Sequence, residues 1–148
     1  MKKLILAAAL ALGFSTAFSA RADSAWLTDY KKAQQEAKNT KKLLFLNFTG
    51  SDWCGYCIVL DRAILSQPQF KDYASKNLVL LEIDFPRRKT QSAELKNQNA
   101  TLAEQFQVQG FPTIVVLNGE GKVVWHFEGL FTGAPKAFIA ELEKLRKS

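Results

Sequence analysis

Cysteine, histidine and methionine are scarce in this sequence of 148 residues, which contains two cysteines, one histidine and one methionine. A structural zinc site takes four ligands, and Cys54, Cys57 and the distant His126 do not supply that number. Copper(I) bound by the two thiolates stays an alternative, although no histidine lies near them and Met1 is the only methionine. We therefore expect no metal and no other cofactor.

The sequence also lacks a stripe of basic residues interleaved with aromatic residues, which argues against nucleic acid as a partner. Its formal net charge is +6, and half of this excess lies within residues 1–22. One compact basic run remains in the rest of the chain, Arg87-Arg88-Lys89, which we interpret as a solvated surface loop.

Residues 1–22 have the layout of a secretory signal peptide, with lysines first, then an apolar stretch, then small residues. Cleavage at an A-x-A site after Ala22 would leave residues 23–148, although a site ending at Ser19 competes with it. The apolar stretch is about 15 residues long, short against the ~20 that a membrane-spanning helix needs, so an uncleaved anchor is the weaker alternative. No repeat or linker divides residues 23–148, so the sequence predicts one domain in a periplasmic or otherwise exported bacterial protein.

The hydrophobic pattern alternates between helical and extended segments. In chain order we expect a helix over about 24–39, a buried strand over 43–48, helical segments over 54–65 and from 68, a strand over 78–83, a helix around 101–106, a hairpin of strands over 113–117 and 122–127, and a closing helix through 138–145. This order predicts an α/β domain with a mixed central sheet that helices cover on both faces.

Cys54 and Cys57 stand where the first buried strand gives way to a helix. A sulfur at the start of a helix lies beside unpaired backbone N–H groups and the positive end of the helix dipole, which stabilises a thiolate. Cys54 is the expected nucleophile, and Cys57 is close enough to resolve a mixed disulfide. A static structural disulfide is the alternative, but a bridge between residues three apart closes too short a loop to stabilise a fold much.

Two motifs resemble segments of the thioredoxin superfamily, namely Trp53-Cys54-Gly55-Tyr56-Cys57 and Gly110-Phe111-Pro112-Thr113. The resemblance extends over roughly residues 40 to 147 and implies the thioredoxin fold, a mixed central β-sheet flanked by helices, to which the N-terminal helix is an addition. It implies a redox-active disulfide between two catalytic cysteines, together with a cis peptide bond before the proline. The residues that it assigns to substrate binding are Trp53, Gly55, Tyr56, Phe111 and Pro112.

The chain departs from this family at one position that matters for proton transfer. Thioredoxins carry a buried aspartate on the strand before the motif, whereas this chain has Asn47 there, or Phe48 if the intervening loop has no extra residue. Neither side chain ionises, so proton transfer to or from Cys57 would need water or another carboxylate. The candidate carboxylates are Asp52, Asp61 and Glu82.

These observations predict an exported thiol–disulfide oxidoreductase that reduces or isomerises protein or peptide disulfides through a mixed disulfide on Cys54. By analogy with the family, a membrane thiol-transfer partner would supply its electrons, and the default oligomeric state is a monomer. Two alternatives remain: a net dithiol oxidase, and a metal-binding or partner-binding module of the same fold without redox turnover.

Overall fold

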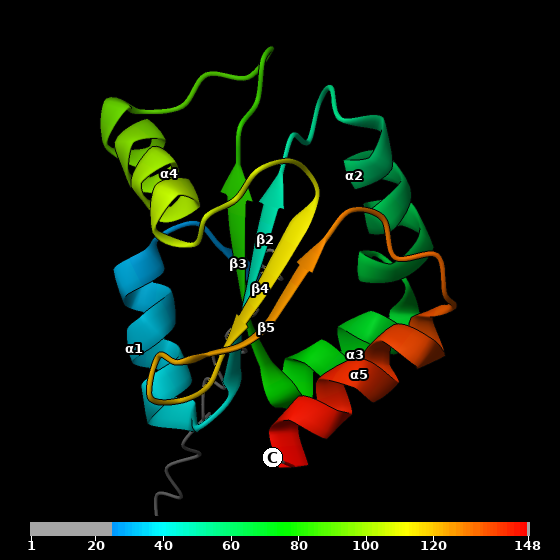
Figure 1. Cartoon of the computed structure of the whole chain (residues 1–148). Helices are drawn as coiled ribbons and strands as arrows, with labels where there is room; N and C mark the ends of the chain where they lie inside the picture. The colour runs from blue at the N-terminus through cyan, green and yellow to red at the C-terminus, as the bar shows by residue number, and fades with distance from the viewer. Residues whose placement is uncertain (1–24, 148) are drawn as a thin grey trace, which may run out of the picture.

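The computed structural model describes residues 25–147, which are built around a five-stranded sheet with the strand order β1-β3-β2-β4-β5 (Figure 1). The strands are β1 (Trp26–Leu27), β2 (Leu43–Thr49), β3 (Leu78–Asp84), β4 (Thr113–Leu117) and β5 (Val123–Glu128). β3 pairs in parallel with both β1 and β2, whereas β4 is antiparallel to β2 and to β5. The predicted mixed sheet and its terminal hairpin are thus confirmed.

Helices cover both faces of the sheet, as the sequence predicts (Figure 1). One face carries α1 (Tyr30–Thr40) and α4 (Ala93–Gln105), and the other carries α2 (Gly55–Leu60), the π-helical turn η1 (Asp61–Leu65), α3 (Pro68–Asn77) and α5 (Pro135–Lys147). Pro68 stands in the first turn of α3, where its missing N–H costs no hydrogen bond.

Strand β2 is buried along its whole length because it lies in the middle of the sheet between the two helical layers. Its side chains alternate between the layers: Phe45 packs with α3 and α5, whereas Leu46 and Phe48 pack with α1 and α4. The strand ends at Thr49, which brings the following loop and its two cysteines to one end of the sheet.

Two predicted helices begin elsewhere than expected. The first starts at Tyr30, not near residue 24, because the Asp29 side chain caps it by accepting the Lys32 N–H at 2.9 Å. Trp26, expected on that helix, instead lies in β1 and pairs with Leu80. The fourth helix starts at Ala93 and not near 101, with Ser92 accepting the Leu95 N–H at 3.1 Å.

The predicted signal peptide over residues 1–22 lies outside the described residues. Within residues 25–147, no helix combines the length and the apolar character that crossing a membrane requires.

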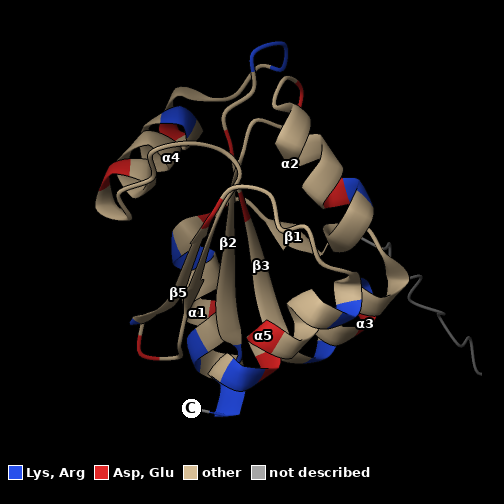
Figure 2. Cartoon of the chain, turned by 45° about the vertical axis from the view of Figure 1, so that its right-hand side comes forward, with Lys and Arg blue, Asp and Glu red and all other residues tan. Residues whose placement is uncertain are grey.

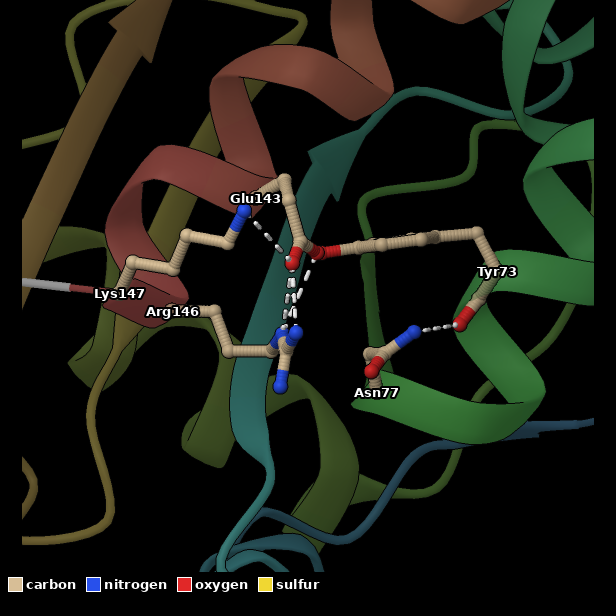
Figure 3. A network of polar contacts seen from close by, with 5 residues as sticks. All are labelled: Tyr73, Asn77, Glu143, Arg146 and Lys147. Carbon is tan, nitrogen blue, oxygen red and sulfur yellow. Dashed lines mark hydrogen bonds and ion pairs between the residues drawn. The ribbon is translucent and has the colours of Figure 1, made fainter.

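A polar network joins α3 to α5 at the end of the molecule away from the cysteines (Figure 3). The Tyr73 hydroxyl donates to the Glu143 carboxylate at 3.0 Å, and Arg146 contacts that carboxylate at 2.5 Å. Burial raises the pKa of Tyr73 to about 12, and the hydrogen bond to Glu143 acts in the same direction. The phenol therefore stays protonated and keeps donating to Glu143.

Candidate active site

Cys54 and Cys57 form a disulfide at the junction of β2 and α2, with their Cα atoms 5.2 Å apart. Cys54 caps α2 in an extended conformation, and its sulfur accepts the Cys57 N–H at 3.3 Å. The Cys57 sulfur accepts the Gly50 N–H at 3.5 Å. Both residues are nearly buried, with 8% of Cys54 and 4% of Cys57 exposed. A backbone donor therefore reaches each sulfur, and at Cys54, which caps the start of α2, such a donor would stabilise the thiolate.

Trp53, the residue before Cys54, packs its indole against the backbone of Gly50. Its indole N–H donates to the Phe85 carbonyl at 2.7 Å, and its ring meets Phe111 edge-on with centroids 6.0 Å apart. A Cβ on Gly50 would fall 2.5 Å from the indole, so this position needs glycine for the tryptophan to pack here. The residues around Gly50 in the sequence give no sign of this close approach, because it depends on how the indole packs.

The other residues assigned to substrate binding lie in two segments, at the start of α2 and just before β4. Tyr56 is 65% exposed at the start of α2, and a side chain on Gly55 would meet nothing within 4 Å. Phe111 is half-buried, and its peptide bond to the buried Pro112 is cis. Among the described residues, no backbone hydrogen bond involves the Phe111 N–H or C=O. This stretch of backbone is therefore free to pair with another chain.

The loop before Cys54 is tied to the loop after β3. The Ser51 N–H and hydroxyl both donate to the buried Asp84 carboxylate, at 2.9 and 2.5 Å. Asp52 accepts the backbone N–H groups of Arg87 at 2.9 Å and Arg88 at 2.7 Å. The Arg87 N–H holds the pKa of Asp52 below its ordinary value. Asp52 therefore serves as an anchor between the loops, and its distance in sequence from Arg87 explains why sequence reasoning missed the link.

A cavity of about 390 Å³ lies beside Cys57 and is lined by Asn47, Asp61, Glu82 and Lys89 among others. Asn47 pairs in register with Glu82 on the neighbouring strand, and its side-chain oxygen is buried without a hydrogen-bond partner in residues 25–147. Burial raises the pKa of Glu82, with a further contribution from Asp84. Of the two positions left open by the sequence, Asn47 is thus the one on the Cys57 side, because Phe48 packs on the opposite face.

Residues that could hold a metal ion are not gathered anywhere in residues 25–147, where no group of three or more His, Cys, Asp or Glu side chains has a suitable arrangement. His126 lies on β5 opposite Val115, and its nearest acidic partner is Glu128 at 3.9 Å.

The Thioredoxin-like domain family matches residues 30–146 of this chain. Disulfide bond reductase DsbH of Chlamydia pneumoniae is 35% identical over 118 residues, which cover 80% of this chain and 70% of that protein. Thioredoxin-related protein DsbJ of the same organism is 28% identical over 100 residues, 68% of this chain but only 29% of DsbJ. A solved structure of DsbH oxidoreductase superposes with a TM-score of 0.76 at 34% identity, covering 82% of this chain and 83% of that one.

The sheet topology and a Cys-x-x-Cys disulfide at a strand–helix junction define a thiol–disulfide oxidoreductase of the thioredoxin fold. The family match and the identity with DsbH then place the chain in the family: it belongs to the thioredoxin-like domain family, within the thioredoxin superfamily.

Proposed function

We propose that this protein is an exported oxidoreductase that reduces or isomerises disulfides in other proteins. The observation that carries the proposal is the Cys54–Cys57 disulfide, whose two sulfurs each accept a backbone N–H at the end of the sheet. A signal peptide over residues 1–22 and a mature domain over residues 23–148 fit this function, because exported proteins meet disulfides as substrates.

In the reductive direction the Cys54 thiolate attacks one sulfur of a substrate disulfide. A bond forms between Cys54 and that sulfur, the substrate S–S bond breaks, and the other substrate sulfur leaves as a thiol after taking a proton. Cys57 then loses its proton and attacks the Cys54 sulfur, which releases the second substrate thiol. Two electrons pass from the protein to the substrate, and the Cys54–Cys57 disulfide is left behind.

The substrate chain would add as a strand beside the Phe111 backbone, whose N–H and C=O form no backbone hydrogen bond within the described residues. Trp53 and Tyr56 would offer aromatic surface on either side of the sulfur, while Gly55 leaves the approach to Cys54 open. Pro112 would hold the Phe111 backbone in position, since its carbonyl is anchored by the Gly129 N–H at 2.9 Å. Peptide and protein disulfides both fit such a surface.

Glu82 is the carboxylate that best fits the role of proton acceptor for Cys57. Glu82 lines the same cavity as Cys57. Its raised pKa lies closer to the pKa of a thiol than that of an ordinary glutamate does, which makes it a better proton acceptor for Cys57. Asp61 lines the same cavity, whereas both oxygens of Asp52 are occupied by Arg87 and Arg88. Water in the cavity would connect Glu82 to the sulfur.

We expect Glu82→Gln to slow the release of substrate from the mixed disulfide by about a hundredfold near neutral pH, because the general base is lost. The wild-type rate should fall as the pH is lowered and Glu82 becomes protonated. The rate of the variant should not show this fall. Stopped-flow measurement of substrate thiol release between pH 4 and 9 would show the difference. Glu104→Gln, on the exposed side of α4, is the matched control. Identical pH profiles for all three proteins would exclude Glu82 from this role.

The Glu82→Gln variant should react more slowly than the wild type without being less stable. Because the folded-state pKa of Glu82 is raised, its ionisation favours unfolding, so stability is lost as pH rises through that pKa. At pH values above the folded-state pKa of Glu82, Glu82→Gln should therefore be at least as stable as the wild type. A slower reaction in a protein that is no less stable separates proton transfer from a folding defect.

The direction of electron flow and the partner follow from analogy. DsbH, with which this chain shares 35% identity, is named a disulfide bond reductase, which favours reduction over oxidation. A reductase in an oxidising compartment needs a supply of electrons, and a membrane thiol-transfer protein would provide it to a monomer of this chain.

The reduction potential of the Cys54–Cys57 pair tests the proposed function. Titration of the mature chain against thiol–disulfide buffers, with free thiols counted, should give a value near or below about −200 mV. A value near about −120 mV would instead make the protein a net oxidant. Failure of the pair to titrate reversibly would favour a binding module without redox turnover.

A further inference from the structure

The basic run after β3 is held firmly against the loop that leads into Cys54. Asp52 accepts the backbone N–H groups of both Arg87 and Arg88, and the Trp53 indole donates to Phe85 just before them. The Phe85 N–H in turn donates to the Thr49 carbonyl at 2.8 Å. The predicted surface loop is confirmed, with residues 87–89 exposed, and its backbone is also fixed at several atoms.

The residues of this run are exposed, and Arg87 lies on the tryptophan that precedes Cys54. The Arg87 guanidinium carbon lies 3.8 Å from the centroid of the Trp53 ring, a cation–π contact next to Cys54 in sequence. Arg88 is exposed, and within the described residues neither arginine is in a salt bridge with a carboxylate. Figure 2 shows the run as a blue loop at the end of the molecule where α2 begins.

We propose that Arg87 and Arg88 form a cationic rim of the substrate site that selects protein disulfides flanked by acidic residues. This inference rests on the proposed function, since it names the substrate class of the same site. Asp52 is the acidic residue nearest in the loop, and its two oxygens are used by backbone N–H groups, so it fixes the rim without forming a salt bridge with either guanidinium.

The placement explains why the rim would act on the substrate. A chain that adds beside Phe111 would lie close to the Trp53 ring, since the two ring centroids are 6.0 Å apart, and Arg87 lies on that same tryptophan ring. Carboxylates two or three residues from the substrate cysteine would then come within reach of guanidinium groups that form no salt bridge within residues 25–147. Complementary charge of this kind mainly accelerates encounter and selects among partners.

The test uses three peptides that share one intramolecular disulfide and carry glutamate, glutamine or lysine beside the cysteines. The pre-reduced protein is mixed with each peptide, and the second-order rate is divided by the rate of dithiothreitol with the same peptide. This division removes the effect of flanking charge on the intrinsic reactivity of the peptide disulfide. We expect the glutamate peptide to react about tenfold faster than the lysine peptide at low salt.

The double variant Arg87→Gln/Arg88→Gln should lose this preference, and Arg87→Lys/Arg88→Lys should keep most of it. Lys31→Gln/Lys32→Gln, which removes the same charge from the exposed side of α1, should leave the preference unchanged. At 1 M NaCl, where the Debye length is only about 3 Å, the wild-type preference should disappear.

Equal normalised rates for the glutamate and lysine peptides would overturn the rim while leaving the oxidoreductase intact. No reaction with any peptide would instead overturn the proposed function. A third outcome is that the protein shows no peptide preference but binds vesicles containing phosphatidylglycerol, and that the arginine-to-glutamine variant does not bind them. This result would assign the rim to a lipid surface and would also overturn the inference.

Discussion

Cys57→Ala should stop catalytic turnover and leave the substrate covalently attached to Cys54. The variant keeps the nucleophile at the start of α2, so the first exchange proceeds. It lacks the second thiol, whose Cα lies 5.2 Å from that of Cys54, and this chain has no other cysteine to replace it. Because intramolecular attack by an oriented group is so much faster than attack from solution, we expect turnover to fall by about a thousandfold or more.

Intact-mass measurement after mixing the variant with a peptide disulfide would detect the adduct directly. Cys54→Ala should give little adduct, because Cys57 is half as exposed as Cys54 and its sulfur accepts the Gly50 N–H. The double variant lacking both sulfurs is the blank. Faster adduct formation on Cys57 in Cys54→Ala than on Cys54 in Cys57→Ala would reverse the two assigned roles.

Phe45→Ala should cause the largest loss of stability of any single substitution considered for this protein. Phe45 is fully buried in β2, and its ring packs edge-on against Trp26, Phe70 and Phe138 with centroids 5.7 to 6.1 Å away. Truncation removes contacts with β1, α3 and α5 at once and leaves a cavity. We expect the free energy of unfolding to fall by about 3 to 5 kcal/mol.

Guanidinium unfolding of the oxidised protein would measure this change, provided that the slope of the transition is unaltered. Val59→Ala is the control, because this side chain is 47% exposed on α2 and should cost little. A loss below about 1 kcal/mol for Phe45→Ala would mean that the aromatic cluster collapses around the gap.

Local sequence patterns correctly predicted those strands and turns that are determined mainly by residues close together in the sequence. The apolar run over 43–48 became β2, and the turn at Asn118 formed the hairpin, where the asparagine side chain accepts the N–H groups of Glu120 and Lys122. Trp26 was misplaced on a helix because its spacing to Tyr30 suits a helix. What holds it in β1 is pairing with Leu80, a contact that sequence spacing does not reveal.

The sequence by itself determined the fold class, the strand–helix position of the two cysteines and the motif around the proline, since each follows from the order of nearby residue types. Only the tertiary structure decided which distant residues lie near the cysteine motif. The pairing of Asn47 with Glu82 put a carboxylate in the cavity that Cys57 also lines, and the packing of two loops put Arg87 on Trp53. Both arrangements join residues twenty-five or more positions apart, and the strand register and loop packing that bring them together depend on the whole sheet.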